Sequence, residues 1–529
     1  MTADRTRSGA ARRVRARSFA SGSKTTILPP WLLCLAGQIL LLYIAAAIYV
    51  HDVVSIDQFE PTPQPARMIQ QAGHRLVSST PAFELMFFDH RRPVRLGFHV
   101  TIDGIPVRDI WNAYFDRLLA CLDLDGNRAL DRKEISRVPA SLLSRPVWAF
   151  VFTDSSQFCD FDAIDRAPRD GRVSREELLL HSLKGGTFPV QVLAGRSPEW
   201  SEQLSAALFE LLDQDQDGNL SQADCVRLTA GLARCNHNQD GLLSPEEVAG
   251  QTGPLYPLGN REFAQTSRFA FLPSGSINEQ MIEQLMHRYD KNRNDRLSRG
   301  EVGLPAELFD SLDADRNGEW SAGELRQWQQ PDYVVEVELR TDPWKKLTTR
   351  MRPSKKTETR EFAVSTGLAG IPTLRTPTCL VDLKAMHGRL QAVFEASNRL
   401  AVATFLETDA DSDGVLDRRD IRSSKNFAAL APILDKNWDG KVSIAEFDSF
   451  VALQREAVRG HVVLTILDLQ RGLFQLLDRD RDSLLSTQEL SGAWTVLAAW
   501  DENGDGVVSK NELPQQYHVT VSQGQPWRP

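Results

Sequence analysis

The chain has 529 residues, of which 42% are hydrophobic and 25% charged, and its 70 acidic against 61 basic residues give a net charge of −9. Its one basic run lies in residues 1–30, where seven basic residues against one acidic residue give +6. Nucleic-acid binding requires clustered Lys and Arg, so this balance disfavours it. Metalloprotease, phosphate-loop and serine-hydrolase motifs are absent from the sequence, and we expect no enzymatic activity.

The N-terminal segment has the pattern of a membrane anchor. Residues 31–50 form an uncharged apolar stretch long enough to cross a bilayer as a helix, and positive charge precedes it. The pattern predicts a basic cytoplasmic tail at 1–30 and a transmembrane signal-anchor at 31–50. The protein would then be a single-pass protein of the cell membrane, with the bulk of the chain extracytoplasmic. The alternative is cleavage of this segment as a signal peptide, which would leave a secreted protein.

The closely spaced Pro61, Pro63 and Pro65 predict a linker over residues 51–90, and several later segments alternate as strands do. Apolar residues at every second position predict a hairpin beginning near Leu96, a strand from Tyr333 to Leu339 and another around Val519. Apolar residues at helical spacing predict amphipathic helices that end at Leu122 and Leu212.

An acidic loop template recurs ten times along the chain. In its clearest copy, oxygen-bearing side chains stand at positions 1, 3, 5, 9 and 12, glycine stands at 6 and an apolar residue at 8. That copy comprises Asp213, Asp215, Asp217, Gly218, Leu220, Ser221 and Asp224. A Ca²⁺ ion takes six to eight oxygen ligands, so alternate side chains of a tight loop must turn inward, while position 6 needs a backbone conformation that glycine tolerates best. The spacing therefore predicts a calcium loop.

Four further loops match the template completely. They are Asp313, Asp315, Asn317, Gly318, Trp320, Ser321 and Glu324; Asp409, Asp411, Asp413, Gly414, Leu416, Asp417 and Asp420; Asp435, Asn437, Asp439, Gly440, Val442, Ser443 and Glu446; and Asp501, Asn503, Asp505, Gly506, Val508, Ser509 and Glu512.

Three loops keep the ligands but have another residue at position 6, for which we expect weaker binding. They are Asp123, Asp125, Asn127, Asp131 and Glu134, with Arg128; Asp290, Asn292, Asn294, Ser298 and Glu301, with Asp295; and Asp478, Asp480, Asp482, Ser486 and Glu489, with Ser483. The loop with Asn236, Asn238, Asp240, Ser244 and Glu247 has two carboxylates among its ligands and should also be weak.

The tenth loop is degenerate. Asp170, Gly171, Ser174 and Glu177 match its second half, but Arg166 occupies position 1. Only an insertion could bring Asp162 or Asp165 into place. This loop is predicted to be a structural partner without an ion.

These loops resemble those of the EF-hand superfamily, and the chain resembles bacterial membrane-anchored proteins with multiple EF-hand domains. The resemblance implies loops that work in pairs. The predicted pairs begin at 213 and 236, 290 and 313, 409 and 435, and 478 and 501, with the degenerate loop beside the loop at 123. The expected fold is mainly α, with about five tandem EF-hand pairs and short β segments between them. The predicted domains are a hairpin and first pair at 91–190, pairs at 191–260 and 261–330, a β and loop region at 331–389, and pairs at 390–455 and 456–529.

The expected function is binding of several Ca²⁺ ions in an exported, membrane-anchored scaffold. Two alternatives remain: a calcium-dependent adhesion or assembly module similar to dockerins, which would have a protein partner at the cell surface, and a calcium sensor. A sensor tends to present a methionine-rich groove, and this chain has seven methionines. Of the six cysteines, most are expected to be small core residues, although one disulfide is possible.

Overall fold

The computed structural model describes residues 80–524. The gaps within this range are 137, 139–142, 144–158, 167–168, 185–187, 197–198, 228–235, 250–267, 274–276, 278, 305, 329–330, 355–361 and 367–369. All structural statements below concern the described residues.

The first of two six-stranded sheets joins segments far apart in the chain. Its order is β11-β10-β2-β1-β7, with β3 paired to β2. Strands β2 and β10 are parallel, and the other neighbours are antiparallel. The strands are β1 (Phe83–Phe88), β2 (Pro93–Ile102), β3 (Ile105–Pro106), β7 (Phe269–Leu272), β10 (Tyr333–Leu339) and β11 (Thr348–Pro353). The predicted hairpin and the predicted strand from Tyr333 to Leu339 are confirmed, while β1 lies within the segment predicted as a linker.

The second sheet has the order β12-β13-β14-β20-β17-β4. Strands β14 and β20 are parallel, as are β17 and β4, and the remaining pairs are antiparallel. The strands are β4 (Val190–Arg196), β12 (Ala363–Thr366), β13 (Pro372–Arg375), β14 (Cys379–Met386), β17 (Val462–Gln470) and β20 (Gln515–Ser522). Strand β20 confirms the predicted strand around Val519.

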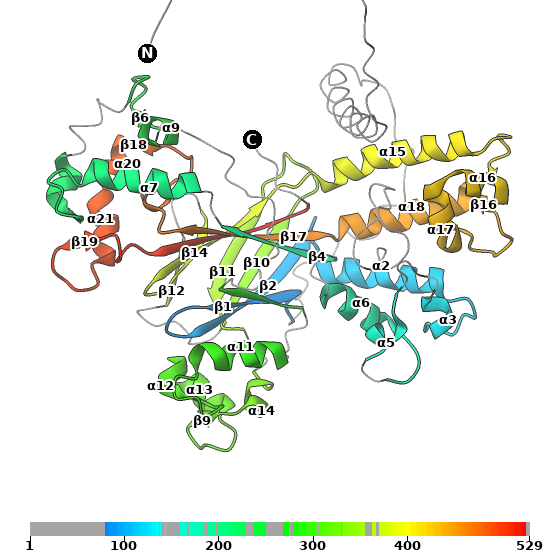
Figure 1. Ribbon diagram of the computed structural model, residues 1–529, viewed down its shortest axis with the longest axis horizontal. Helices are drawn as coiled ribbons and strands as arrows, with labels where there is room; N and C mark the ends of the chain where they lie inside the picture. Colours follow the sequence, from blue (N-terminus) through cyan, green and yellow to red (C-terminus); the bar gives the residue numbers. More distant parts are fainter. Residues whose placement is uncertain are drawn as a thin grey trace, which may run out of the picture. The chain divides into compact units, whose positions relative to one another are not determined.

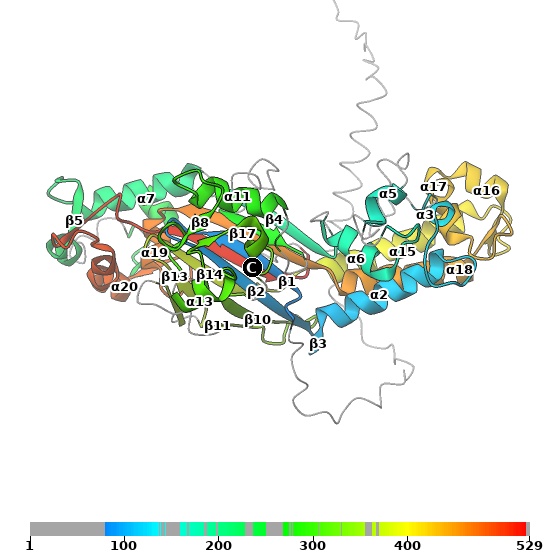
Figure 2. The same cartoon turned by 90° about the horizontal axis from the view of Figure 1, so that it is seen from below.

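Aromatic contacts join the two sheets into one core. The ring of Tyr517 on β20 lies 5.8 Å from the ring of Phe87 on β1 and 5.1 Å from that of Phe269 on β7. The strands of both sheets gather at the centre of Figure 1 and of Figure 2. One cluster of buried apolar side chains runs through both sheets and into the neighbouring helices.

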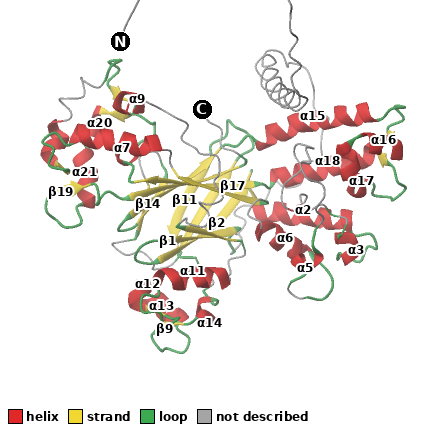
Figure 3. Cartoon of the chain, in the orientation of Figure 1, coloured by secondary structure: helices red, strands yellow, loops and turns green. Residues whose placement is uncertain are grey.

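The helices and the short loop strands form three groups outside the sheets, visible in Figure 3. Group 1 contains α2 (Val107–Leu122), α3 (Arg132–Ile135), α5 (Phe161–Ile164), α6 (Arg175–Lys184), α15 (Leu390–Thr408), β15 (Val415–Leu416), α16 (Arg418–Ser423), α17 (Lys425–Leu434), β16 (Val442–Ser443) and α18 (Ile444–Arg459). Group 2 contains α7 (Glu199–Leu212), β5 (Asn219–Ser221), β6 (Leu242–Leu243), α9 (Pro245–Ala249), α19 (Leu473–Leu477), β18 (Leu485–Ser486), α20 (Thr487–Ser491), α21 (Ala493–Leu497), η1 (Ala498–Trp500) and β19 (Val507–Ser509). Group 3 contains α11 (Glu279–Tyr289), β8 (Leu297–Ser298), α12 (Arg299–Val302), α13 (Ala306–Leu312), β9 (Glu319–Trp320) and α14 (Ala322–Leu325).

The prediction of a mainly α fold built from tandem EF-hand pairs is wrong. The protein is mixed α/β, with two large sheets, and it is not an array of EF-hand repeats. The segments between the loops were expected to be short and local. They instead pair with strands that lie far away in the sequence. An alternating pattern within one segment does not reveal such partners.

The membrane predictions also need correction. Among the described residues, no helix is long and apolar enough to span a bilayer. The predicted anchor at 31–50 lies outside the described residues. The anchor, the membrane as a partner and the single-pass location at the cell membrane are therefore not supported.

A buried ion pair fixes the first sheet to group 3. Arg95 on β2 is fully buried, and its Nε and Nη2 atoms donate to Glu84 Oε2 on β1 at 3.0 and 2.5 Å. The same guanidinium donates to the carbonyl oxygen of Trp328, which follows α14. The backbone N–H of Arg95 donates to Asp332 Oδ2 at 2.7 Å. Both charges of the pair are buried, so each depends on the other.

We predict that Glu84→Ala lowers the free energy of unfolding by about 3–5 kcal/mol, because it removes the carboxylate facing a buried guanidinium. The matched control is Arg352→Ala, which breaks the exposed pair with Glu336 and should cost at most about 1 kcal/mol. Urea unfolding of both variants measures the difference. Equal losses would contradict the assignment of Arg95 and Glu84 as a structural pair.

Candidate metal centres

The first residue of each complete loop holds the loop closed. In the loop beginning at Asp213, the backbone N–H of Gly218 donates to Asp213 Oδ2 at 3.0 Å. The corresponding bond from position 6 to position 1 measures 2.7–3.1 Å in the loops beginning at 123, 290, 313, 409, 435, 478 and 501. A carboxylate at position 1 is thereby aimed into the loop.

Position 6 has a positive φ whether or not it is glycine. The glycines at this position have φ values such as 83° at Gly218 and 84° at Gly506. Arg128, Asp295 and Ser483, which replace glycine, have φ values of 66°, 58° and 68°. A side chain in this region carries a modest strain. The three loops without glycine thus adopt the backbone conformation of the others.

Position 12 is the second anchor of the loop. In nine loops its carboxylate accepts a hydrogen bond of 2.8–3.1 Å from the backbone N–H at position 9. In seven of them the other oxygen accepts from the N–H at position 2, at 2.7–3.3 Å. The N–H of Ser509 lowers the pKa of Glu512, which keeps this carboxylate charged. In those seven loops both oxygens of position 12 are therefore held by the backbone of the loop.

The apolar residue at position 8 ties every loop to a hydrophobic core. All ten of these side chains have 0% exposure: Leu130, Val173, Leu220, Leu243, Leu297, Trp320, Leu416, Val442, Leu485 and Val508. Each also pairs through its backbone with position 8 of a second loop. This burial explains why the template has an apolar residue at position 8.

The loops do not all pair as their spacing predicted. The loops at 290 and 313 pair through β8 and β9, and those at 409 and 435 through β15 and β16, as expected. In group 2, however, the loop at 213 pairs with that at 501 through β5 and β19, and the loop at 236 pairs with that at 478 through β6 and β18. The predicted pairs 213 with 236 and 478 with 501 are wrong. Loops that are close in sequence are not paired in group 2, because the strands of the two sheets bring the later loops of the chain back to this group.

Five loops bring three carboxylates within 4.8 Å of one another. These clusters are Asp123, Asp125 and Glu134; Asp213, Asp215 and Asp217; Asp313, Asp315 and Glu324; Asp409, Asp411 and Asp413; and Asp478, Asp480 and Glu489. The loops at 236, 290, 435 and 501 have asparagine at position 3, where the five clustered loops have aspartate. Oxygen donors at this density fit a hard cation such as Ca²⁺, although exposed acidic groups also occur without an ion.

Some ligand oxygens are buried without a hydrogen-bond donor. These are Oδ1 of Asp435, Asp478 and Asn236, all at position 1. Buried acceptors are normally satisfied, so an unsatisfied one favours a missing partner such as an ion or water. Burial raises the pKa of Asp478 to about 6. The pKa of Asp411 is also raised, first by the neighbouring charge of Asp413. These carboxylates repel one another or lie out of water, and a cation would relieve both effects.

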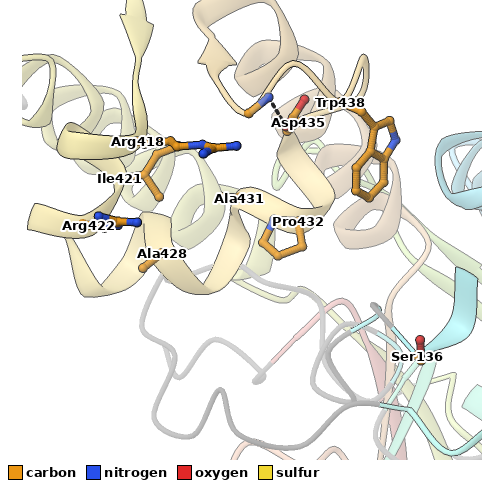
Figure 4. A pocket seen from close by; sticks show the side chains of 10 residues that line it. Ser136, Arg418, Ile421, Arg422, Ala428, Ala431, Pro432, Asp435 and Trp438 are labelled. Atoms are coloured by element: carbon orange, nitrogen blue, oxygen red, sulfur yellow. Dashed lines mark hydrogen bonds between the residues drawn. The ribbon is translucent and has the colours of Figure 1, made fainter. Parts of the chain in front are cut away.

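A cavity of about 500 Å³ lies beside the loop at 435 and not within it. Figure 4 shows Pro432 and Trp438 at this cavity, together with Arg418 and Arg422 from α16. Its lining combines apolar side chains with two arginines. The lining also includes Asp435, the first ligand of the adjacent loop.

The described cysteines, Cys121, Cys159, Cys225 and Cys379, are all free thiols.

Comparison of the chain with models of protein families, with curated proteins and with solved structures found no match. The argument for metal binding therefore depends on the loops themselves.

We predict that acid releases the ion of the loop at 478 as the pH falls through about 6. The folded, ion-free pKa of Asp478 lies above the ordinary value, so the ion-free fold loses stability as the pH rises through about 6. Calcium requires the carboxylate, so protons compete with it below that pH, by up to about tenfold in affinity per pH unit. Equilibrium dialysis should show that Asp478→Asn binds one ion fewer than the wild type at pH 7.5. At pH 5, with free calcium held near the Kd of this site at pH 7.5, the deficit should shrink severalfold, and an equal deficit at both pH values would contradict this.

We predict that the loops at 213 and 501 bind calcium as a coupled pair. The N–H of Gly506 donates to Asp501 Oδ2, and Gly241 holds position 6 of the loop at 236, so these two amide resonances report on their own loops in protein labelled with ¹⁵N-glycine. Asp213→Asn should raise the calcium midpoint at Gly506 several-fold and leave Gly241 nearly unchanged. The control is Asp448→Asn, on the exposed face of α18. If Asp213→Asn shifts the calcium midpoint at Gly241 and not at Gly506, the loop at 213 is coupled to the loop at 236, and this prediction is wrong.

Proposed function

We propose that this protein binds several Ca²⁺ ions and that the ions serve to hold its fold together. The observation that carries the proposal is the repeated loop geometry. Nine loops place oxygen ligands at the template positions, and all nine have the same bond from position 9 to position 12. This bond is half of a helix capping box, which any helix can use, so it is its combination with oxygen ligands at alternate positions that a simple turn does not require.

The position-8 anchors support a structural role for the ions. Each loop contributes a fully buried side chain to a core, so an ion that orders the loop also orders part of that core. In group 2 the same anchors, Leu220 with Val508 and Leu243 with Leu485, join segments that lie far apart in sequence. Ions bound in these loops would stabilise the folded state, in which the paired loops are in contact, over states in which the two segments separate.

The anchors also favour this role over that of a calcium sensor. A sensor exposes a new apolar groove when the ion binds. Here the helices leading into the loops, such as α2 and α7, bury their apolar faces in cores shared with strands or with helices of a second loop pair. Opening such a helix would separate elements that hold the rest of the protein.

We predict that the full chain binds at least five Ca²⁺ ions and unfolds at a higher temperature with calcium than with EDTA. Ligands that bind only the folded state stabilise it, by about 2.7 kcal/mol for each independent site at a hundredfold excess over its Kd. Equilibrium dialysis counts the ions, and calorimetry measures the unfolding temperature.

The matched variants are Asp409→Asn, which should lose one ion, and Asp448→Asn, which should lose none. A chain that retains no ion in excess calcium, with an unfolding temperature indifferent to EDTA, would contradict the proposal. A large rise in the fluorescence of an apolar dye on adding calcium would instead support the sensor.

A further inference from the structure

The degenerate loop between α5 and α6 is bound to the loop at 123. Leu130 and Val173 exchange two backbone hydrogen bonds of 2.9 Å, and both side chains are fully buried. The sequence predicted this partnership and predicted that the loop would hold no ion. The partnership is confirmed, while the hydrogen bonds of the loop point to a different conclusion about the ion.

The hydrogen bonds place Asp165 in the role of position 1. The N–H of Gly171 donates to Asp165 Oδ2 at 3.0 Å, as position 6 does to position 1 in the complete loops. The N–H of Arg166 donates to Glu177 Oε1 at 3.2 Å, as position 2 does to position 12. The loop thus runs from Asp165 to Glu177, with one residue more than the template.

The second half of the loop keeps the template bonds as well. The N–H of Arg172 donates to Asp170 Oδ1 at 3.0 Å, as position 7 does to position 5 in the loop at 213. The N–H of Ser174 donates to Glu177 Oε2 at 3.0 Å, and Gly171 has a φ of 80°. The described residues from Asp170 to Glu177 therefore keep the hydrogen bonds of a complete loop.

An independent observation indicates that Asp165 faces a ligand. Its side chain is only 6% exposed, and its Oδ1 atom is buried without a hydrogen-bond partner. The other oxygen of the same carboxylate accepts from Gly171, so the group points into the loop. A buried carboxylate oxygen with no partner is costly, and a cation in the loop would satisfy it.

Asp162 is excluded as the alternative ligand. Its two oxygens accept from the guanidinium of Arg132 at 2.6 and 3.0 Å in an exposed ion pair. That pair lies on the surface and leaves Asp165 as the carboxylate within the loop.

We propose that the carboxylates of Asp165, Asp170 and Glu177 are the ligands of a further calcium site. The proposal rests on calcium binding by the other loops. It adds an ion to group 1, opposite the loop at 123, so that both members of this pair are filled. These three carboxylates are not among the groups within 4.8 Å of one another and must move together around an ion, so the site should bind less tightly than the complete loops.

The test is calcium titration of the full chain labelled with ¹⁵N-glycine, followed at the amide resonance of Gly171. This amide donates to Asp165, so it reports on the carboxylate directly. In the wild type the Gly171 resonance should shift with calcium. In Asp165→Asn, which can still accept the bond from Gly171, the calcium midpoint should rise at least tenfold. Glu177→Gln is the second variant and should give the same result.

The matched control is Asp162→Asn, which removes a nearby exposed carboxylate and should leave the Gly171 response unchanged. A Gly171 resonance indifferent to calcium, while Gly218 and Gly414 respond, would overturn this site and leave the proposed function intact. An equal response in Asp165→Asn and in the wild type would also overturn it. If none of the position-6 glycines responds, it is the proposed function that fails.

Discussion

The structure depends on one constraint: the apolar residue at the eighth position of each loop is buried against its counterpart in a second loop. Leu220 with Val508 and Leu297 with Trp320 are examples, and all four side chains are fully buried. The constraint joins acidic loops at the surface to the hydrophobic cores beneath them. It explains how so many carboxylates can be gathered on short turns without being free to separate, and why a cation bound there would act on the whole fold.

Local chemistry was predictable from the sequence, and long-range pairing was not. The ligand spacing, the buried eighth position and the strands around Val100, Val337 and Val519 follow from patterns of a few residues, and the structure contains each of them. The two sheets instead depend on strand partners distant in the chain, such as β2 with β10 and β17 with β4. An alternating pattern shows which side chains of a strand share one face, but it does not identify the strand that pairs with it. The sequence therefore indicated separate helical pairs where the chain forms a mixed α/β core.

The same limit applies at the loops, in their pairing and in the register of the degenerate loop. Counting residues paired the loop at 213 with that at 236, but the sheets bring the loop at 501 beside the first and the loop at 478 beside the second. Counting residues also set aside the degenerate loop, because a template of fixed length cannot accommodate an extra residue. The hydrogen bond from Gly171 to Asp165 makes the register visible. In both cases spacing was an imperfect substitute for geometry.

The central claim is that calcium bound in the loops holds distant parts of the chain together. Amide hydrogen exchange of the full chain, in calcium and in EDTA, tests this claim most directly at the strand pair of residues 219–221 with 507–509. The account predicts that chelation accelerates exchange in both segments together, and that exchange in the sheet strands β2 and β10 changes less. Exchange at the paired loop strands that is the same with and without calcium would contradict it.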